Sequence, residues 1–387
     1  KPTVGVPVNP TVEMMQATKQ AGSKHTGVVV MNPNNGEILA MANYPGFDLN
    51  NPRNLEPFFQ ENEIKAMADE KKLEFLNQLW QNFCITSTFE PGSTVKPFTV
   101  ASGLDSGKLA GTEEFICDGS EVIGTHTIHC VKREGHGRET IKQALMNSCN
   151  DALMQMGGII GKEEFYKYQD VFGFGLKTNI DLPGEARTNS LVYHLADSSD
   201  VSLATNAFGQ NFNATMIQVA SGMCSLINGG TYYQPHVIKE VRTETGTLVE
   251  NYQNKVVKKT VSKETSAYLK QCLYSVVQEG TGRSAKVDGY TMGGKTGTAQ
   301  KLPREEENYL VSFIGHVPAD NPEVLIYVVI DEANLENQAQ SSYASGLVKE
   351  ILAEILPYLN IYPDEGKKDM TQITTFEENY EGSIFGN

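Results

Sequence analysis

The chain has 387 residues, 40% of them hydrophobic, and a formal net charge of -15 at pH 7. Its length exceeds the needs of one small core and predicts two lobes or two domains. The acidic balance excludes nucleic acid and an anionic membrane surface as main partners, because both repel a negatively charged protein. No run approaches the roughly 18 apolar residues of a transmembrane helix, and no secretory signal pattern opens the chain.

Both ends of the chain show the patterns of β-strands. Two apolar runs, 27–32 and 37–43, flank Asn34-Asn35-Gly36, and Asn-Gly between such runs is typical of a hairpin. Further strands are predicted at 290–301, 309–316 and 324–331, followed by a helix over 341–356 that stops at Pro357. We expect residues 1–24 to be the remnant of a non-catalytic N-terminal region, and 363–387 to be an acidic tail.

Helical patterns fill the middle of the chain. They are predicted at 63–82, 93–105, 139–147, 150–158, 163–171, 214–227 and 263–278, with loops and short strands over 111–137. We therefore predict an α+β domain over residues 25–362. Segments 25–45 and 288–357 would form one antiparallel sheet flanked by helices, and about 50–285 would form a mainly helical lobe. The active site is expected in the cleft between them.

The first motif, Ser93-Thr94-Val95-Lys96, can supply a nucleophile and a base. Ser93 precedes an apolar run, so it lies where a helix begins, and the positive end of the helix dipole favours an alkoxide there. Lys96 follows one turn later on the same face. To act as a base its amine must be neutral, which burial and a second cation, Lys295, would promote. The alternative is a helix cap followed by a surface lysine.

Two further motifs complete the pattern. Ser148-Cys149-Asn150 separates two helical segments, where Ser148 could relay a proton and Asn150 could hold Lys96; an ordinary helix corner is the alternative. Lys295-Thr296-Gly297-Thr298 lies in a probable edge strand, along which an extended peptide could bind. Residues 289–296 also match a phosphate-binding loop, but polar residues precede them and Gly297 follows, so we interpret that match as coincidence.

The three motifs in this order resemble those of class B penicillin-binding proteins, whose signature is S-x-x-K, an S-x-N element and K-T-G. The resemblance extends over about residues 26–357, through 26–50, Phe172-Gly173-Phe174-Gly175 and the KTGTAQ run at 295–300. It is strongest to the division and sporulation group. It implies the fold shared by penicillin-binding proteins and serine β-lactamases, and serine D,D-transpeptidase activity without a cofactor or metal.

Carried to this sequence, the resemblance assigns roles to particular residues. Ser93 would be acylated by D-Ala-D-Ala stem peptides or by β-lactams, with Lys96 as its base. The other roles would belong to Ser148, Asn150 and Lys295 in proton transfer and charge, and to Thr296, Gly297 and Thr298 in substrate binding. The N–H groups of Ser93 and Thr298 would form the oxyanion hole. Cys149 departs from the family pattern, in which Ser is common, and we do not assign it a catalytic role.

Further expectations follow from the same resemblance. The partners would include a membrane glycosyltransferase and division or sporulation proteins. The location would be the extracytoplasmic face of the membrane of a Gram-positive-type bacterium, with an N-terminal anchor helix outside this chain. A D,D-carboxypeptidase, a β-lactamase and a non-catalytic β-lactam sensor or scaffold are the alternatives. The sequence shows no clear device for activating a deacylating water, which disfavours the β-lactamase.

Cys117 and Cys130 flank a predicted small hairpin. Outside the cytoplasm a disulfide between them is plausible, and two reduced thiols are the alternative. His126, His129 and His136 lie nearby in the sequence, but their spacing is poor for a metal site, so we predict none.

Overall fold

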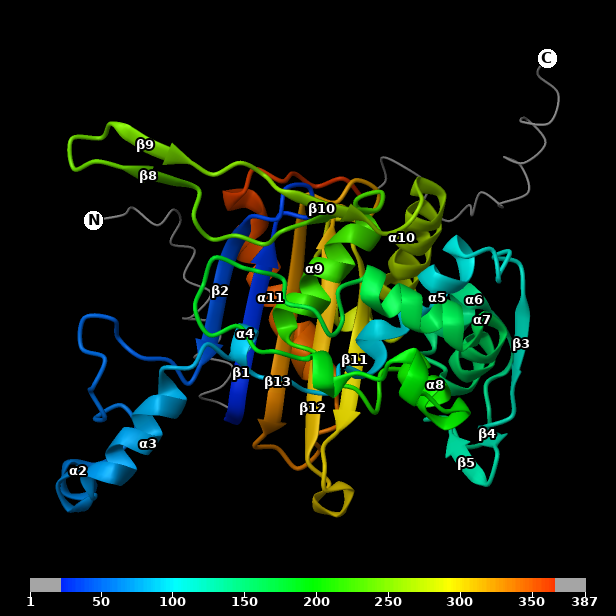
Figure 1. The fold of residues 1–387 in the computed structure, drawn as a ribbon, viewed down its shortest axis with the longest axis horizontal. Coiled ribbons are helices and arrows are strands. Elements are labelled where there is room, and N and C mark those ends of the chain that lie inside the picture. The colour runs from blue at the N-terminus through cyan, green and yellow to red at the C-terminus, as the bar shows by residue number, and fades with distance from the viewer. Residues whose placement is uncertain (1–21, 366–387) are drawn as a thin grey trace.

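The computed structural model describes residues 22–365. Its centre is an antiparallel five-stranded sheet with the order β11–β12–β13–β1–β2. The strands are β1 (Ser23–Met31), β2 (Ile38–Tyr44), β11 (Gly293–Gln300), β12 (Tyr309–Val317) and β13 (Val324–Ala333). Strands from the two ends of the chain therefore lie side by side, as predicted, with β1 paired to β13 (Figure 1).

The predicted hairpin between β1 and β2 is confirmed. Asn32 donates its N–H to the carbonyl of Glu37, and Gly36 closes the turn with a φ of +83°. A side chain at Gly36 would also meet the backbone of Gln234 at 2.7 Å, so this turn requires glycine.

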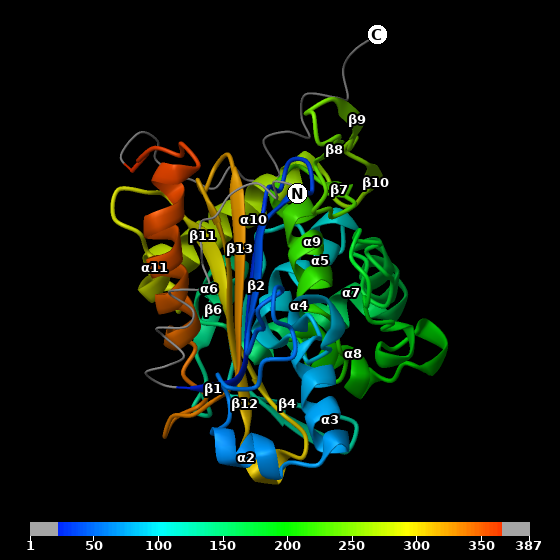
Figure 2. The ribbon, with the colours of Figure 1, turned by 90° about the vertical axis from the view of Figure 1, so that its left-hand side faces the viewer.

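The sheet is buried on both faces. Along β1, Val28 and Val30 pack into one hydrophobic core, whereas Val29 and Met31 pack into the other, as the alternation of side chains along a strand requires. Helix α11 (Ser342–Tyr358) covers the first face, and the helical lobe covers the second (Figure 2). Pro357 lies inside the last turn of α11, so this helix ends one residue beyond the predicted stop.

The helical lobe differs in detail from the prediction. Its helices are α2 (Glu61–Ala66), α3 (Asp69–Leu79), α4 (Phe83–Thr86), α5 (Lys96–Asp105), α6 (Ile141–Met146), α7 (Asn150–Val171), α8 (Asp200–Ala207), α9 (Met216–Ile227) and α10 (Lys263–Gln278). The helix predicted at 63–82 is two helices, because Met67 and Ala68 are extended. The two helices predicted within 150–171 are present as the two parts of α7, because Gly161, with a φ of +76° and a ψ of 161°, is not helical and separates them.

Within the described residues, short strands form four separate two-stranded sheets outside the central sheet. They are β3 (Glu114–Cys117), β4 (Ser120–Ile123), β5 (His126–His129), β6 (Gly137–Thr140), β7 (Thr231–Tyr233), β8 (Glu240–Arg242), β9 (Leu248–Asn251) and β10 (Val256–Lys259). The β4–β5 pair is the small hairpin predicted between Cys117 and Cys130. Within residues 22–365, no helix has the length and apolar character to cross a membrane. Most of the predicted N-terminal remnant, 1–24, and of the acidic tail, 363–387, lies outside the described residues.

Candidate active site

Ser93 lies in a tight turn that leads into a buried helix. The 3-10 turn η1 (Gly92–Val95) continues directly into α5, with Pro97 in the first turn of the helix, where the missing N–H costs little. Ser93 is partly exposed, whereas Gly92, Thr94 and Val95 are buried. A reactive hydroxyl at this position is accessible and lies at the positive end of the helix dipole.

Lys96 is fully buried, so the alternative of a surface lysine is wrong. Its Nζ donates to the backbone oxygen of Ser148 at 2.5 Å, to Ser148 Oγ at 3.1 Å and to Asn150 Oδ1 at 2.7 Å. Among the described residues these contacts replace the direct hydrogen bond to Ser93 that the sequence spacing suggests. The reason is local: Ser93 is in a 3-10 turn rather than in the helix, and the second motif supplies better-placed oxygens.

Lys295 joins the same group from the sheet. It is also fully buried, and its Nζ lies 3.0 Å from Ser148 Oγ. Ser148 therefore connects the two lysines, Lys96 from α5 and Lys295 from β11, as the relay role requires. Ser148 itself adopts a left-handed backbone conformation, with a φ of +54°, which is uncommon for a residue other than glycine and is typical of functional sites.

The environment of the two lysines favours their neutral forms. Burial lowers the pKa of Lys96 from 10.5 to about 8, although nearby acidic groups act in the opposite direction. Burial, with the nearby charge of Lys96, also lowers the pKa of Lys295 well below its usual range. Two ammonium groups that share one hydroxyl oppose each other's ionisation, so the pair is suited to proton transfer near neutral pH.

The third motif lies on the edge strand of the sheet, as predicted, and packs tightly against the Ser93 turn. A Cβ on Gly92, whose φ is +57°, would lie 2.7 Å from the carbonyl oxygen of Thr298. A Cβ on Gly297 would lie 2.8 Å from Thr94. These glycines let the backbones of η1 and β11 approach closely, which is the arrangement that an oxyanion hole between the two segments needs. Because residues 289–296 lead into a strand and not into a helix, a phosphate loop is excluded.

Two site residues were missed by the sequence interpretation. Thr281 Oγ1 lies 2.9 Å from Thr296 Oγ1, and its N–H donates to the backbone oxygen of Met146 at 3.1 Å. Gly209 accepts a hydrogen bond from the N–H of Gly92 at 2.9 Å. Both lie in short glycine-containing segments, Gly280-Thr281-Gly282 and Gly209-Gln210. Glycine alone does not indicate which other segment of the chain these residues will contact.

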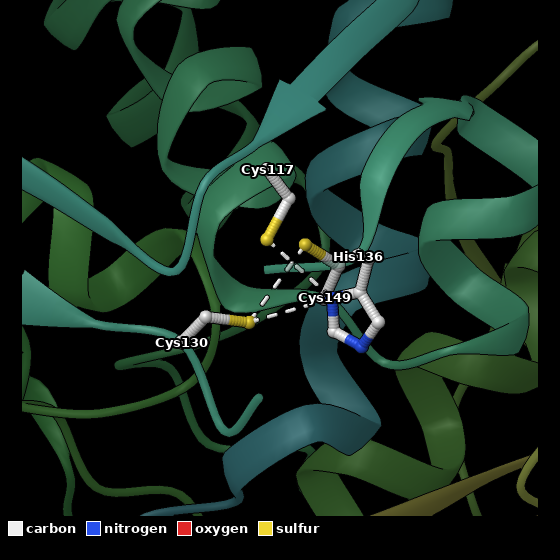
Figure 3. Close-up of side chains that lie close together, drawn as sticks. All are labelled: Cys117, Cys130, His136 and Cys149. Carbon is white, nitrogen blue, oxygen red and sulfur yellow. Dashed lines mark hydrogen bonds between the residues drawn. The ribbon is translucent and has the colours of Figure 1, made fainter. Parts of the chain in front are cut away.

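The structure corresponds to one of the two alternatives left open for Cys117 and Cys130. Both are free thiols, as are all six cysteines in the described structure. Cys117 and Cys130 lie beside His136 and Cys149, and the four donor atoms are within 4.8 Å of one another (Figure 3). The spacing along the sequence concealed this cluster, because Cys149 comes from the N-terminus of α7, outside the segment that contains the other three residues. His126 and His129 lie on β5 and are not part of the cluster.

Comparison with known proteins identifies the class. The family model described as penicillin binding protein transpeptidase domain matches residues 26–356, and the chain belongs to this family. It is a class B penicillin-binding protein transpeptidase domain of the division and sporulation group, as the sequence resemblance predicted. The predicted fold is confirmed as well.

Individual relatives show how similar the chain is to known members of the family. It is 37% identical to stage V sporulation protein D of Bacillus subtilis over 87% of this chain and 49% of that protein. It is 29% identical to penicillin-binding protein PbpB of Mycolicibacterium smegmatis over 94% of this chain and 55% of that protein. The chain thus spans about half the length of the curated relatives it matches. A structure of penicillin binding protein 3 of Mycobacterium tuberculosis, complexed with ampicillin, has a TM-score of 0.78 at 26% identity, covering 94% of this chain and 79% of that one.

Proposed function

We propose that this chain is a serine D,D-transpeptidase that cross-links peptidoglycan stem peptides through an acyl-enzyme on Ser93 and is inhibited by β-lactams. The observation that carries the proposal is the hydrogen-bonded series Lys96–Ser148–Lys295, completed by Asn150, beside an accessible serine. Relatives named probable peptidoglycan D,D-transpeptidase, such as PenA of Neisseria meningitidis at 27% identity, support the reaction class.

In the proposed reaction, Ser93 Oγ attacks the carbonyl carbon of the penultimate D-Ala and gives its proton to the neutral Lys96 amine. The N–H groups of Ser93 and Thr298 bind the oxyanion, and the C–N bond breaks as the proton passes through Ser148 to the departing D-Ala amine. An acceptor amine then attacks the Ser93 ester and restores the hydroxyl. The substrate carboxylate, held by Lys295 and Thr296, would favour the charged form of Lys295 and leave Lys96 neutral.

The proposal extends to the setting of the whole protein. Membership of the family favours work at the extracytoplasmic face of the membrane of a Gram-positive-type bacterium. A membrane glycosyltransferase and division or sporulation proteins are the proposed partners. The proposed domain limits are residues 25–362.

Intact-protein mass spectrometry after incubation with benzylpenicillin tests the acyl-enzyme. We expect the wild type and Ser102→Ala to gain the full mass of the drug, and Ser93→Ala to gain none. Ser102 is a matched control because its buried hydroxyl lies on α5, the helix that follows the Ser93 turn, and donates to the Thr99 backbone oxygen. An adduct on Ser93→Ala would overturn the assignment of the nucleophile.

Assays of the same purified protein with stem peptides and with benzylpenicillin distinguish the alternative functions. A transpeptidase joins an acceptor amine to a D-Ala-D-Ala donor, whereas a carboxypeptidase only releases D-Ala. Rapid drug hydrolysis without an adduct would identify a β-lactamase. Acylation by the drug without any reaction of a stem peptide would identify a sensor.

A further inference from the structure

Four potential metal ligands converge behind the second motif. Cys117 ends β3, Cys130 follows β5, His136 precedes β6 and Cys149 caps the N-terminus of α7. Their side chains point toward one another from these separate segments (Figure 3). Cys117, Cys130 and Cys149 are at most 2% exposed, and the His136 side chain is 11% exposed.

The distances between these atoms suit a tetrahedral ion. His136 Nδ1 lies 3.4 Å from Cys117 Sγ and 3.7 Å from Cys130 Sγ, and the sulfurs of Cys130 and Cys149 are 3.8 Å apart. With Zn–S bonds of about 2.3 Å and Zn–N bonds of about 2.0–2.1 Å, neighbouring ligand atoms of a tetrahedron are about 3.5–3.8 Å apart. A disulfide would require about 2.05 Å between sulfurs.

The short strands around the cluster are only partly held by the hydrophobic core. Phe115 and the three cysteines belong to the main core, but Ile116, Val122 and Val131 are 59%, 69% and 70% exposed. The β3–β6 and β4–β5 pairs are two-stranded, and isolated two-stranded pairs are marginally stable in water. A cross-link among the buried cysteines would add to the stabilisation that this packing supplies.

The backbone holds the ligand-bearing turns in place. A Cβ on Gly119 would lie 2.0 Å from the oxygen of Arg133, and one on Gly135 would lie 2.3 Å from the oxygen of Cys117, so glycine permits both approaches. The buried carboxylate of Asp151, on α7, accepts the N–H groups of Asp118 and Gly119 at 3.1 and 3.3 Å. The turn after Cys117 is thereby fixed to the helix that Cys149 caps.

A buried carboxylate also lies beside the cluster. Glu139 is 2% exposed, and its Oε2 is buried without a hydrogen-bond partner among the described residues. This oxygen lies 3.9 Å from His136 Nδ1. An unpartnered buried carboxylate oxygen is costly, so a polar partner at this place is not supplied by the described residues.

We propose that Cys117, Cys130, His136 and Cys149 bind one structural Zn²⁺ ion. Three thiols would lose their protons to solvent, and the neutral imidazole would bind through Nδ1, giving a Cys₃His site. The protein would occupy all four coordination positions of the ion, as in structural rather than catalytic zinc sites. The site would be separate from the serine chemistry, which needs no metal.

The ion would act on the active site through Cys149. This residue lies between Ser148 and Asn150, whose oxygens hold Lys96, and its sulfur also accepts the N–H of Ala152 at 3.3 Å. Fixing Cys149 would therefore fix the positions of both neighbours. We assign the zinc ligands a positioning role, because none of them needs to touch the substrate.

Metal analysis of the purified chain tests the site directly. We expect about one zinc per chain in the wild type and in Cys224→Ser, and little in Cys117→Ser and Cys130→Ser. Cys224 is a matched control because it is buried in α9 but lies outside the cluster. Replacement of zinc by Co²⁺ should give the visible absorption of a tetrahedral thiolate site. Cys117→Ser should also lower Tm by about 5 °C or more relative to Cys224→Ser.

The readouts do not depend on the proposed enzyme reaction, so the failure of either proposal can be recognised separately. A wild type without zinc, from zinc-supplemented growth and chelator-free purification, overturns the site. A mass about 2 Da below the reduced value assigns two of these cysteines to a disulfide instead. Equal zinc content in Cys117→Ser and Cys224→Ser would place the ion elsewhere.

Discussion

The two motif lysines come from the sheet and from the helical lobe, whereas the cysteine cluster lies among short strands that the core holds only in part. Lys96 and Lys295 come from α5 and β11 and are both fully buried. Cys117 and Cys130 are also buried against the main core, but the nearby side chains of Ile116, Val122 and Val131 are largely exposed. Packing therefore positions the first group, and we expect contacts within the cluster to help position the second.

The second motif connects these two regions. Ser148 contacts both Lys96 and Lys295, and Cys149, the next residue, belongs to the cysteine cluster. Because Ser148 and Cys149 are adjacent, a displacement in one region should also displace the other. Variants that change one region at a time test how strongly the two regions affect each other.

The largest effect is expected on the catalytic side. Lys96→Met removes the buried amine and should slow acylation by benzylpenicillin about 10³-fold, within the range for loss of a general base. Lys108→Met, which changes an exposed lysine, is the control and should leave the rate unchanged. Stopped-flow or quenched mass measurements give the rates.

The pH dependence of the acylation rate tests whether the loss of rate in Lys96→Met comes from the loss of Lys96 as the base. The pKa of Lys96 is lowered to about 8, and the reactive form is neutral, so the wild-type rate should rise with pH up to about 8. Below that pH it should fall about tenfold per unit, because the neutral fraction falls in that proportion. The residual rate of Lys96→Met should lack this dependence. The same profile in both proteins would contradict the assignment.

A smaller effect is expected from Gly92→Ala, which tests the contact between η1 and β11. The new methyl would meet the Thr298 oxygen at 2.7 Å, and we expect acylation to slow about 10²-fold as the Ser93 turn shifts. Gly107→Ala is the control, because Gly107 also has a positive φ, +71°, but nothing lies within 4 Å of its added Cβ. Gly107→Ala should lose about 1–2 kcal/mol of stability from the positive φ alone, and Gly92→Ala should lose more because of the added overlap. Equal acylation rates would show that close contact at Gly92 is not required.

The smallest effect is expected at the surface of the cysteine segment. Arg138 and Glu114 form a 2.9 Å ion pair between β6 and β3, with side chains 65% and 47% exposed. Arg138→Ala should lower the free energy of unfolding by no more than about 0.5 kcal/mol, because solvent screens exposed pairs. Urea unfolding measures this loss. A loss as large as that of Cys117→Ser would mean that surface charge, rather than the buried cluster, holds this segment.

Much of the fold followed from local patterns. The β1–β2 hairpin was predictable because Asn34-Asn35-Gly36 is a strong turn signal, and the long apolar run of β13 was predictable as a strand. The separation of two helices at Gly161 was predictable as well. Less predictable was the break at Met67 and Ala68 between α2 and α3. That break depends on how the helices pack, which periodicity in the sequence does not report.

The sequence by itself determined the family and the order of the three motifs, and it predicted Ser93, Lys96 and Lys295 as site residues, because these short motifs are distinctive. Only the tertiary structure decided that Lys96 bonds to Ser148 and Asn150 instead of Ser93. It alone also brought Cys149 and His136 to the two hairpin cysteines. The reason is physical: such contacts join segments far apart along the chain, and their distances are set by the packing of the whole domain.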